Sequence, residues 1–574
     1  MKQRIYGLET EYAIKHYPKD SPDLKRKLLS EADLFELLGR ALRRENIPRL
    51  AENKHSTNGY RSALYGYTER VPGDRSGANR DGMFLGNGAR FYMDSGGHPE
   101  YATPECLSVR DVVIYDKAGE RMLEALAQLA EVEMHREGFT GQIFLCKNNV
   151  DIRGNTYGCH ENYLIERKKS SADEGDFFKS LIKHLMPFLV TRQIFLGAGK
   201  VYSGGRLSFQ ISQRSDFIDE EVSSSTTSKR GIINLKDEPL SVREKYRRLH
   251  LILGDSNMSE YMTFLKVGTA GLVLTLIEEG KLTFDLSIAE PVQAIKDIST
   301  DPDLTLKIRL RNGLDVTALE IQNEYLRAAK QCKDNSSIKW TDELATVLVE
   351  WEKILKALSA NDSWSHRAID WKIKQRILAR YLEKEGAKYD ELRKWDFFIG
   401  KMKDLRLERE LLDHLKDDPE AGVEDFLKSK LSQADSIHLR RNLRYLDIDI
   451  NNYYGVHKIY HGLIERDLRY HDIRRDKGLF YVLRNNGFVQ TWGGDSFDEE
   501  IERSQLRAPQ NTRAKIRGQF IKWMNDNNLE GGVRWDSVYI YGKQLKKIDL
   551  PNPFRTSAKK INDIMASYDS TTEI

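Results

Sequence analysis

Hydrophobic and polar residues alternate over Ala89–Asp94. Successive side chains of a strand point to opposite faces, so a strand here places Arg90, Tyr92 and Asp94 on one face. The residues between them are apolar and would pack into a core, which predicts a sheet with one apolar and one polar face. Glu100 and Glu105 follow within reach of the strand's end. A cation, a base and carboxylates gathered in this way indicate a site for phosphate and metal.

The same period of two recurs in an earlier segment, Ile5–Ile14. A strand over this range carries Glu9 and Glu11 on one face. Two carboxylates at this spacing could share Mg²⁺, which prefers oxygen ligands. Exposed glutamates are also common on strands, so a solvated strand face is the alternative.

Two further segments alternate. After the turn at Gly154–Gly158, His160 and Asn162 share one face and the residues between them share the other. The histidine could be a structural hydrogen-bonding group or a catalyst. Leu207–Arg214 alternates as well, with its leucine, phenylalanine and isoleucine expected in the core. Together with Gln142–Cys146, these segments predict a sheet of several strands.

Apolar residues at helical spacing predict helices over Ser21–Asn46, Asp116–Met134, Phe177–Arg192 and from Gly254 to about Glu279. Asp176 is the expected N-cap of the third of these helices, and Pro187 is expected to kink it. Ser256 or Asn257 is the expected N-cap of the fourth, whose free amides would face a negative group.

The second half of the chain changes character. Leu319–Leu446 is mostly helical and highly charged, with a charged helical insertion at about 385–460. A mixed region follows, with a strand expected over Val533–Ile540. The polar tail after Ser557 is expected to fray.

Composition narrows the class of protein. A chain of 574 residues is too long for one core, so two or three domains are expected. With 40% hydrophobic and 31% charged residues it is typical of soluble globular proteins. A net charge of +3 gives nucleic-acid binding no support, although a local basic groove stays possible.

The four cysteines contain no CxxC pair, which argues against a disulfide framework and a cysteine zinc site. The N-terminus has no apolar signal core, and we expect no apolar run that reaches the length of a membrane span. We therefore expect a cytoplasmic protein with no membrane or nucleic-acid partner.

The constellation of charges favours a metal-dependent ATP site on an open sheet. Gly197–Lys200 lacks the spacing of a Walker loop and no Ser or Thr follows its lysine. Ser223–Gly231 could cradle an anion through Arg230 or could be a flexible loop. Asn53–Arg80, just before the strand predicted over Ala89–Asp94, is either a solvated connection or a segment that contacts the substrate. Asp94 is the best candidate for a base.

Five motifs of this sequence resemble the Pup ligase and depupylase family of carboxylate–amine ligases, which are related to glutamine synthetase. They are Gly7–Tyr12, Asn87–Arg90 with its continuation to Cys106, Tyr157–Asn162, Lys229–Asn234 and Tyr246–Glu260. The resemblance covers residues 1 to about 330 and about 465 to 555. It implies an α+β fold in which a curved antiparallel sheet, packed on helices, forms a glutamine-synthetase-like cradle. The implied domains are 1–465, which contains the insertion, and a small C-terminal domain, 466–574.

The resemblance also implies a reaction. In the ligase, ATP phosphorylates the γ-carboxylate of the C-terminal glutamate of Pup, a small disordered ubiquitin-like protein. A substrate lysine then attacks the acyl phosphate, and the isopeptide bond marks the protein for a bacterial proteasome. In the depupylase, water cleaves that bond, and the enzyme can also deamidate a C-terminal glutamine of Pup.

Site residues carry over motif by motif. The resemblance implies Mg²⁺ ligands at Glu9, Tyr92 and Glu100, contacts to ATP from Arg90, Thr103 and Trp535, and a catalytic base at Asp94. Glu11 is a further candidate metal ligand. A carboxyl phosphate needs metal and arginine to neutralise it, which agrees with the polar faces inferred from alternation.

Some motifs favour one branch of the family and some the other. Gly197–Lys200, Val222–Thr227 and Gly254–Glu260 are ligase-like, whereas Arg214–Ile218 and the long segment before Asn87 resemble depupylases. We favour the ligase, because the ligase-like differences lie in loops that should line the site. The insertion leaves open whether the modifier is Pup or a divergent relative. A small-molecule γ-glutamyl–amine ligase is a second alternative.

Overall fold

A computed structural model gives the three-dimensional structure of the chain. It describes residues 3–18, 29–43, 66–68, 82–94, 96–151, 154–202, 207–335, 340–417, 422–433, 435, 437, 439, 441–442, 448–494, 496–527, 529, 531–540 and 546–567. Of the helix predicted over Ser21–Asn46, the described part forms α1 (Glu31–Arg43). The loop predicted over Asn53–Arg80 lies outside the described residues, except for strand β3 (Gly66–Thr68).

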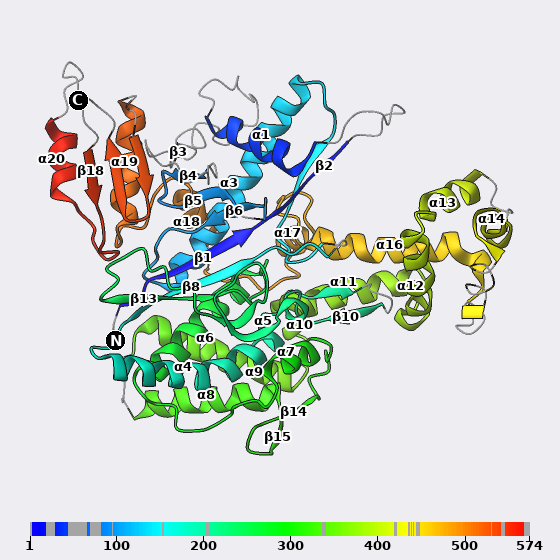
Figure 1. The fold of residues 1–574 in the computed structure, drawn as a ribbon, viewed down its shortest axis with the longest axis horizontal. Coiled ribbons are helices and arrows are strands. Elements are labelled where there is room, and N and C mark those ends of the chain that lie inside the picture. The colour runs from blue at the N-terminus through cyan, green and yellow to red at the C-terminus, as the bar shows by residue number, and fades with distance from the viewer. Residues whose placement is uncertain are drawn as a thin grey trace.

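A nine-stranded sheet forms the centre of the molecule (Figure 1). In spatial order its strands are β11 (Glu220–Ser223), β12 (Gly231–Asn234), β13 (Tyr246–Leu251), β8 (Cys159–Glu166), β1 (Tyr6–Glu11), β6 (Pro99–Ala102), β5 (Arg90–Met93), β4 (Gly82–Leu85) and β3 (Gly66–Thr68). The strands pair antiparallel except for β11 and β12, which are parallel. The predicted α+β fold with a large, mainly antiparallel sheet is confirmed.

The strand register gathers the predicted polar residues on one face of this sheet. Glu11 and Tyr92 both lie opposite Glu100 of β6, and Glu9 lies opposite His160 of β8. Residues directly opposite each other in a ladder share a face, and so do residues two apart on one strand. The polar face predicted from alternation is therefore continuous across four neighbouring strands.

Helices cover the other face of the sheet. The covering set contains α3 (Val109–Arg136), α4 (Ser171–Thr191), α5 (Gln193–Leu196), α6 (Glu260–Glu278), α7 (Pro291–Ser299), α8 (Ala318–Asp334) and α9 (Asp342–Ser359). Their apolar side chains form one core with Leu8, Tyr163 and Leu249, which point away from the polar face. Burial of this face fixes the register, because a shift by one residue would turn every side chain over.

Helix α6 runs through the middle of that core. It is the one helix in the described part of the chain that is long and apolar enough to cross a membrane. The sequence analysis expected no segment of this kind. Its apolar window is wholly buried inside the protein, because other helices and the sheet surround it on all sides. Its composition is that of a core helix.

Two helix starts differ from prediction. Helix α4 is capped by Ser170, which accepts a hydrogen bond from the Asp173 amide, so the predicted cap at Asp176 is wrong. Helix α6 is capped by Ser259, not by Ser256 or Asn257. In both cases several polar residues lie next to the start of the helix, so the apolar periodicity did not show which of them is the N-cap.

Smaller elements complete this part of the chain. They are β2 (Ala13–Tyr17) paired with β7 (Gln142–Cys146), β9 (Lys200–Tyr202) with β10 (Ser208–Gln210), β14 (Lys307–Arg309) with β15 (Asp315–Thr317), η1 (Ser215–Phe217), α10 (Ser365–Ala368) and α11 (Asp370–Lys384). The strand predicted over Leu207–Arg214 is thus only three residues long. Its continuation forms buried turns, in which Asp255 accepts hydrogen bonds from the amides of Gln213 and Arg214.

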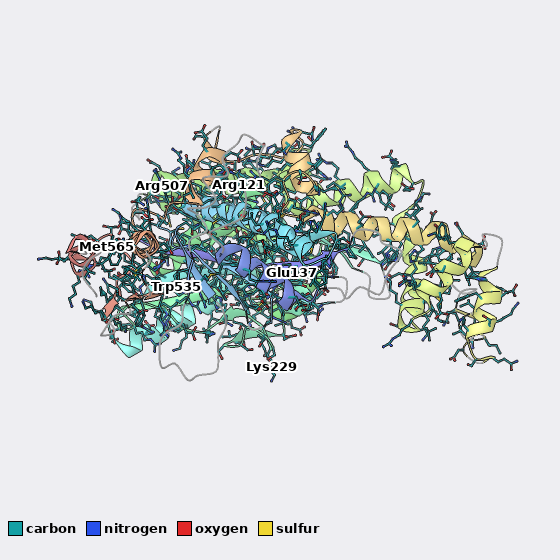
Figure 2. All side chains as sticks on the ribbon, turned by 90° about the horizontal axis from the view of Figure 1, so that it is seen from above. Arg121, Glu137, Lys229, Arg507, Trp535 and Met565 are labelled. Carbon is teal, nitrogen blue, oxygen red and sulfur yellow. The ribbon has the colours of Figure 1, made fainter. Side chains whose placement is uncertain are left out.

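Residues 389–464, which we call the arm, extend away from the rest of the molecule in both views (Figures 1 and 2). The arm contains α12 (Tyr389–Asp404), α13 (Glu408–Asp417), α14 (Val423–Lys430), η2 (Ile450–Asn452) and most of α16 (Tyr453–Tyr470). Its apolar side chains, among them Trp395, Phe398 and Tyr460, form a core together with Leu378 and Leu382 of α11. The predicted helical insertion therefore folds as a small helical unit.

The C-terminal region begins with α17 (Leu479–Asn485) and α18 (Phe497–Ser504), which pack on the main body. It ends in a compact unit of α19 (Ala514–Asp526), β16 (Gly531–Arg534), β17 (Ser537–Ile540), β18 (Lys546–Asp549) and α20 (Lys559–Ser567). The core of this unit includes Phe84 of the large sheet. The domain boundary at 465/466 stays a prediction.

Two details of this unit differ from prediction. The single strand expected over Val533–Ile540 is a hairpin that turns at Trp535 and Asp536. These residues are not the Asn-Gly pair that usually marks such a turn, so no local pattern indicated a turn here. Of the polar tail expected to fray after Ser557, the described part forms α20, which places Ile561 in the core, and residues 568–574 lie outside the described residues.

Candidate functional site

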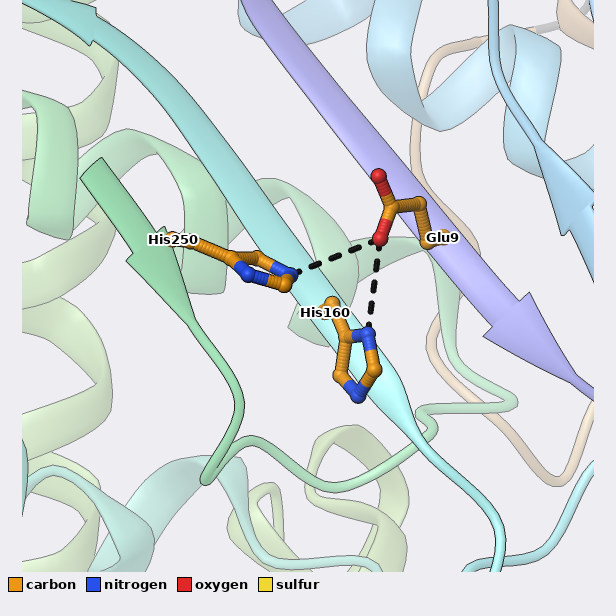
Figure 3. Close-up of side chains that lie close together, drawn as sticks. All are labelled: Glu9, His160 and His250. Carbon is orange, nitrogen blue, oxygen red and sulfur yellow. Dashed lines mark hydrogen bonds and ion pairs between the residues drawn. The ribbon is translucent and has the colours of Figure 1, made fainter. Parts of the chain in front are cut away.

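Glu9 lies at the centre of the polar face. Its Oε2 atom is 3.4 Å from His160 Nδ1 and 3.4 Å from His250 Nε2 (Figure 3), and its Oε1 atom is 3.5 Å from Arg248. Burial would raise the pKa of Glu9, but hydrogen bonds from the two histidines and the charge of Arg248 hold it well below its usual range. Glu9 is therefore ionised and can serve as an anionic ligand.

A row of oxygen donors runs beside Glu9. Burial raises the pKa of Glu100 well above its usual range, and the negative charges of Glu9 and Glu11 raise it further. Burial and then the charge of Glu100 likewise raise the pKa of Tyr92. The Arg90 guanidinium stacks 3.8 Å above the Tyr92 ring. Carboxylates and a phenol at this density form a donor set for a hard cation.

Asp94 ends this row in a tight turn. Its Oδ1 atom accepts a hydrogen bond of 2.6 Å from the His98 amide and lies 3.8 Å from His98 Nδ1. The same ring is 3.1 Å from Glu11 Oε2. Burial opposes the protonation of His98, but the hydrogen bond to Glu11 raises its pKa above the ordinary value. The imidazole thus lies between two carboxylates and fixes the position of both.

A pocket opens at the edge of this face, where strands of the large sheet meet the C-terminal unit. Its lining includes Glu9, Thr103, Arg248, Arg513 and Trp535. The Leu8 amide donates a hydrogen bond of 3.0 Å to the Thr103 hydroxyl, which fixes that side chain at the end of β6. Figure 2 shows Trp535 on the side of the molecule opposite the arm. The pocket joins two predicted nucleotide contacts to one predicted metal ligand.

A buried ion pair holds the C-terminal wall of this pocket. Glu105 accepts hydrogen bonds of 2.8 Å from Arg513 Nε and Arg517 Nη1 and a further one from Arg517 Nη2. Burial opposes ionisation of Glu105, but the two guanidinium charges lower its pKa to about 2. Arg517 also donates to the carbonyl of Trp535 and lies 4.9 Å from its ring centroid. Glu105 thereby positions both the helix and the hairpin beside the pocket.

The loop over Ser223–Gly231 was considered as an anion cradle. In the structure its Arg230 donates to Thr156 Oγ1 at 3.1 Å and to the carbonyl of Thr226 at 3.2 Å. The arginine therefore ties the loop to the segment before β8. The anion cradle and the flexible loop both stay predictions.

The structure places five predicted site residues on one continuous face, namely Glu9, Arg90, Tyr92, Asp94 and Glu100. The sequence analysis had identified these five. It missed the partners that come from other segments, namely His98, Arg248 and His250. A signal existed for the last two, because they lie two apart on β13 and so share a face. Nothing in the sequence indicated that this face would meet Glu9.

The family model for Pup-ligase protein matches residues 4–424 and 450–539. The chain belongs to this family. The two matched ranges contain the whole polar face, Glu105 and Trp535, and they leave out 425–449, which is part of the arm.

Among curated members of the Pup ligase family, the Pup–protein ligase of Nocardioides sp. is 38% identical over 490 residues, which is 84% of this chain and 89% of that protein. The Pup–protein ligase of Xylanimonas cellulosilytica is 35% identical over 572 residues, which is 99% of this chain and all of that protein. The ligase branch that the sequence favoured is the one whose name these relatives carry.

Two solved structures of family members resemble this fold. The complex of Pup with its ligase PafA has a TM-score of 0.71 at 29% identity and covers 98% of this chain and 91% of that chain. The ligase PafA in complex with ADP has a TM-score of 0.67 at 29% identity, with 95% and 98% covered. The glutamine-synthetase-like α+β class predicted from the motifs is therefore confirmed.

Proposed function

We propose that this protein is an ATP-dependent ligase that joins the C-terminal glutamate of Pup to lysines of substrate proteins by isopeptide bonds. The observation that carries the proposal is similarity over 99% of the chain to a Pup–protein ligase. The similar structures, one with Pup and one with ADP, supply the modifier and the nucleotide. By family analogy, the conjugates are marked for a bacterial proteasome and the enzyme acts in the cytoplasm.

The pocket beside the C-terminal unit is the proposed nucleotide site. Thr103 and Trp535 both line it, and Arg90 lies on β5 next to β6. An indole ring offers a surface on which an adenine can stack, and an arginine neutralises phosphate charge. We assign Arg90, Thr103 and Trp535 to ATP on these grounds.

Magnesium fits the oxygen donors of the polar face. Glu9, Tyr92 and Glu100 would hold it, with Glu11 as a further ligand, because Mg²⁺ prefers carboxylates and keeps phosphate oxygens in its shell. When bound, the ion supplies positive charge that neutralises the transferred phosphoryl group. His160 orients Glu9 through a hydrogen bond, His250 Nε2 lies 3.4 Å from the same carboxylate oxygen, and both histidines are outside the proposed ligand set.

The reaction then follows in two steps. The γ-carboxylate of the Pup glutamate attacks the γ-phosphorus of ATP, the bond to ADP breaks, and an acyl phosphate forms. Arg90 stabilises the charge on the phosphoryl oxygens. The lysine amine next attacks the acyl carbon, phosphate leaves, and Asp94 accepts the proton that the amine loses. The hydrogen bond from the His98 amide holds Asp94 in place.

The test is a paired assay. The protein is incubated with ATP, Mg²⁺, Pup ending in glutamate and a lysine-bearing acceptor, and in parallel with preformed conjugate. Conjugate formation without cleavage supports the ligase. Cleavage as the main activity would identify a depupylase instead, and ATP turnover with only a free amino acid would identify a small-molecule γ-glutamyl–amine ligase.

A further inference from the structure

A second group of metal-ligand side chains lies in the arm, far from the polar face of the sheet. Glu408, the first residue of α13, places its Oε1 atom 2.9 Å from His457 Nε2 and 3.1 Å from His461 Nε2. The three ligand atoms lie within 4.8 Å of one another. Both histidines are on α16, four residues apart, so they project from the same face of that helix.

These residues have the chemistry and spacing of a transition-metal site. Two imidazole nitrogens and one carboxylate oxygen are a known ligand set for Zn²⁺, which leaves a fourth position open. Ligand atoms of a tetrahedral zinc ion at ordinary bond lengths are about 3.3–3.4 Å apart. The two Nε2 to Oε1 distances are only slightly shorter, so small side-chain movements would admit an ion. We propose that Glu408, His457 and His461 form a Zn²⁺ site.

The surroundings of the cluster agree with an ion at this position. Tyr453, one turn before His457 on α16, is fully buried, and its hydroxyl has no hydrogen-bond partner among the described residues. Its ring centroid is 5.4 Å from that of His457. Lys403 Nζ, 3.9 Å from Glu408 Oε1, is the opposing feature, since its charge repels a cation. That side chain is 37% exposed and can turn into solvent.

The site would act as a clip within the arm. Glu408 and His457 lie on either side of residues 425–449, the segment that the family model leaves unmatched. A metal bond between α13 and α16 closes this stretch into a loop, which reduces the freedom of the unfolded chain. The proposed metal therefore stabilises a family-divergent part of the molecule and takes no part in ligation.

The experiment measures bound metal directly. The full-length protein is stripped with a chelator, saturated with Mg²⁺ and ADP so that the sheet site is occupied, titrated with Co²⁺ or Zn²⁺, and dialysed. Wild type should retain one more equivalent of metal than His461→Asn or Glu408→Gln and should show the visible absorption band of tetrahedral Co²⁺. Lys403→Gln should tighten binding, because it removes the opposing charge.

The control is His414→Asn, on α13 in the same arm but outside the cluster, and it should bind as wild type does. His461 is 39% exposed, so His461→Asn is expected to fold, which circular dichroism can verify. Zn²⁺ should also slow hydrogen exchange around residues 408–461 in wild type and not in His461→Asn. Equal metal content in wild type and both cluster variants would overturn the proposal.

Discussion

Asp94 and Glu9 show how single side chains acquire roles from their neighbours. Asp94 is positioned by the His98 amide, and Glu9 is contacted by two histidines from strands that are distant in the sequence but close in the sheet. Burial lowers the pKa of His250 to about 4, which the hydrogen bond to Glu9 opposes only in part. His250 is therefore neutral at physiological pH and packs its Nε2 atom against the Glu9 carboxylate as a neutral polar group.

Asp94→Asn should abolish ligation, because an amide cannot accept the lysine proton, while ADP binding stays near the wild-type value. The loss expected from removing a general base is about 10²- to 10⁴-fold in kcat. Single-turnover ligation and an ADP titration measure the two quantities. Full activity of this variant would remove Asp94 from the mechanism.

His250→Ala should weaken Mg²⁺ by about 10–100-fold, the usual effect of losing a group that orients a metal ligand. Ligation rates measured over a range of Mg²⁺ concentrations report this change. His135→Ala is the matched control, because His135 is near the surface and its ring bonds the Gly141 carbonyl. An unchanged Mg²⁺ dependence in His250→Ala would show that the orientation of Glu9 does not matter.

For single residues, the sequence predicted the strand face on which a side chain lies, but not the side chains of other strands that it contacts. A period of two is local, so Arg90, Tyr92 and Glu9 could be assigned to polar faces from the chain alone. The contact between Glu9 and His250 depends on the order of strands β13, β8 and β1, which no local pattern contains.

Among the secondary-structure elements, the pairing of Glu105 with α19 joins the end of β6 to the C-terminal unit. This buried cluster contains two arginines and one carboxylate. The sequence predicted neither this pair nor the hairpin at Trp535, because residues 105 and 517 are remote and the turn lacks Asn or Gly. The existence of long periodic helices such as α3 was predicted, but α3 begins at Val109 and not at the predicted Asp116, because helix starts are less well marked than the apolar stripe.

Glu105→Gln should destabilise the protein by about 3–5 kcal/mol near neutral pH, since it leaves two buried guanidinium groups without a counter-charge. The folded pKa of about 2 lies below the unfolded value of 4.5, so the contribution is present above pH 4.5 and is lost as pH falls toward 2. Urea unfolding at several pH values measures this difference.

The wild-type advantage over Glu105→Gln should thus shrink in acid. Asp549→Asn, an exposed carboxylate on β18, is the control and should change stability by less than about 0.5 kcal/mol at any of these pH values. A difference that does not depend on pH would mean that the Glu105 charge is not what holds α19.

In the molecule as a whole, the arm has an apolar core separate from the one beneath the sheet. Helical content and charge sufficed to predict a helical insertion, because both are local properties. The direction in which it extends depends on how α11 and α16 pack together, which the sequence pattern does not specify.

Phe398→Ala should unfold the arm locally and leave the nucleotide site intact. Phe398 is fully buried, and truncation of such a side chain costs about 3–5 kcal/mol. Hydrogen exchange should accelerate within 389–464 and remain unchanged in the sheet, with ADP affinity preserved. Tyr454→Ala, about half exposed on α16, is the control. Loss of protection throughout the molecule would show that the arm and body unfold together.

The pocket lined by both Glu9 and Trp535 is complete only when nearly the whole chain has been synthesised. A ribosome makes the first strand of the sheet more than 500 residues before Trp535, which lines the same pocket. A nascent chain, or one cut by a protease ahead of α19, lacks the part of the pocket lining that Arg513 and Trp535 supply. If ATP binds in this pocket as proposed, a truncated chain lacks part of the site that ligation needs.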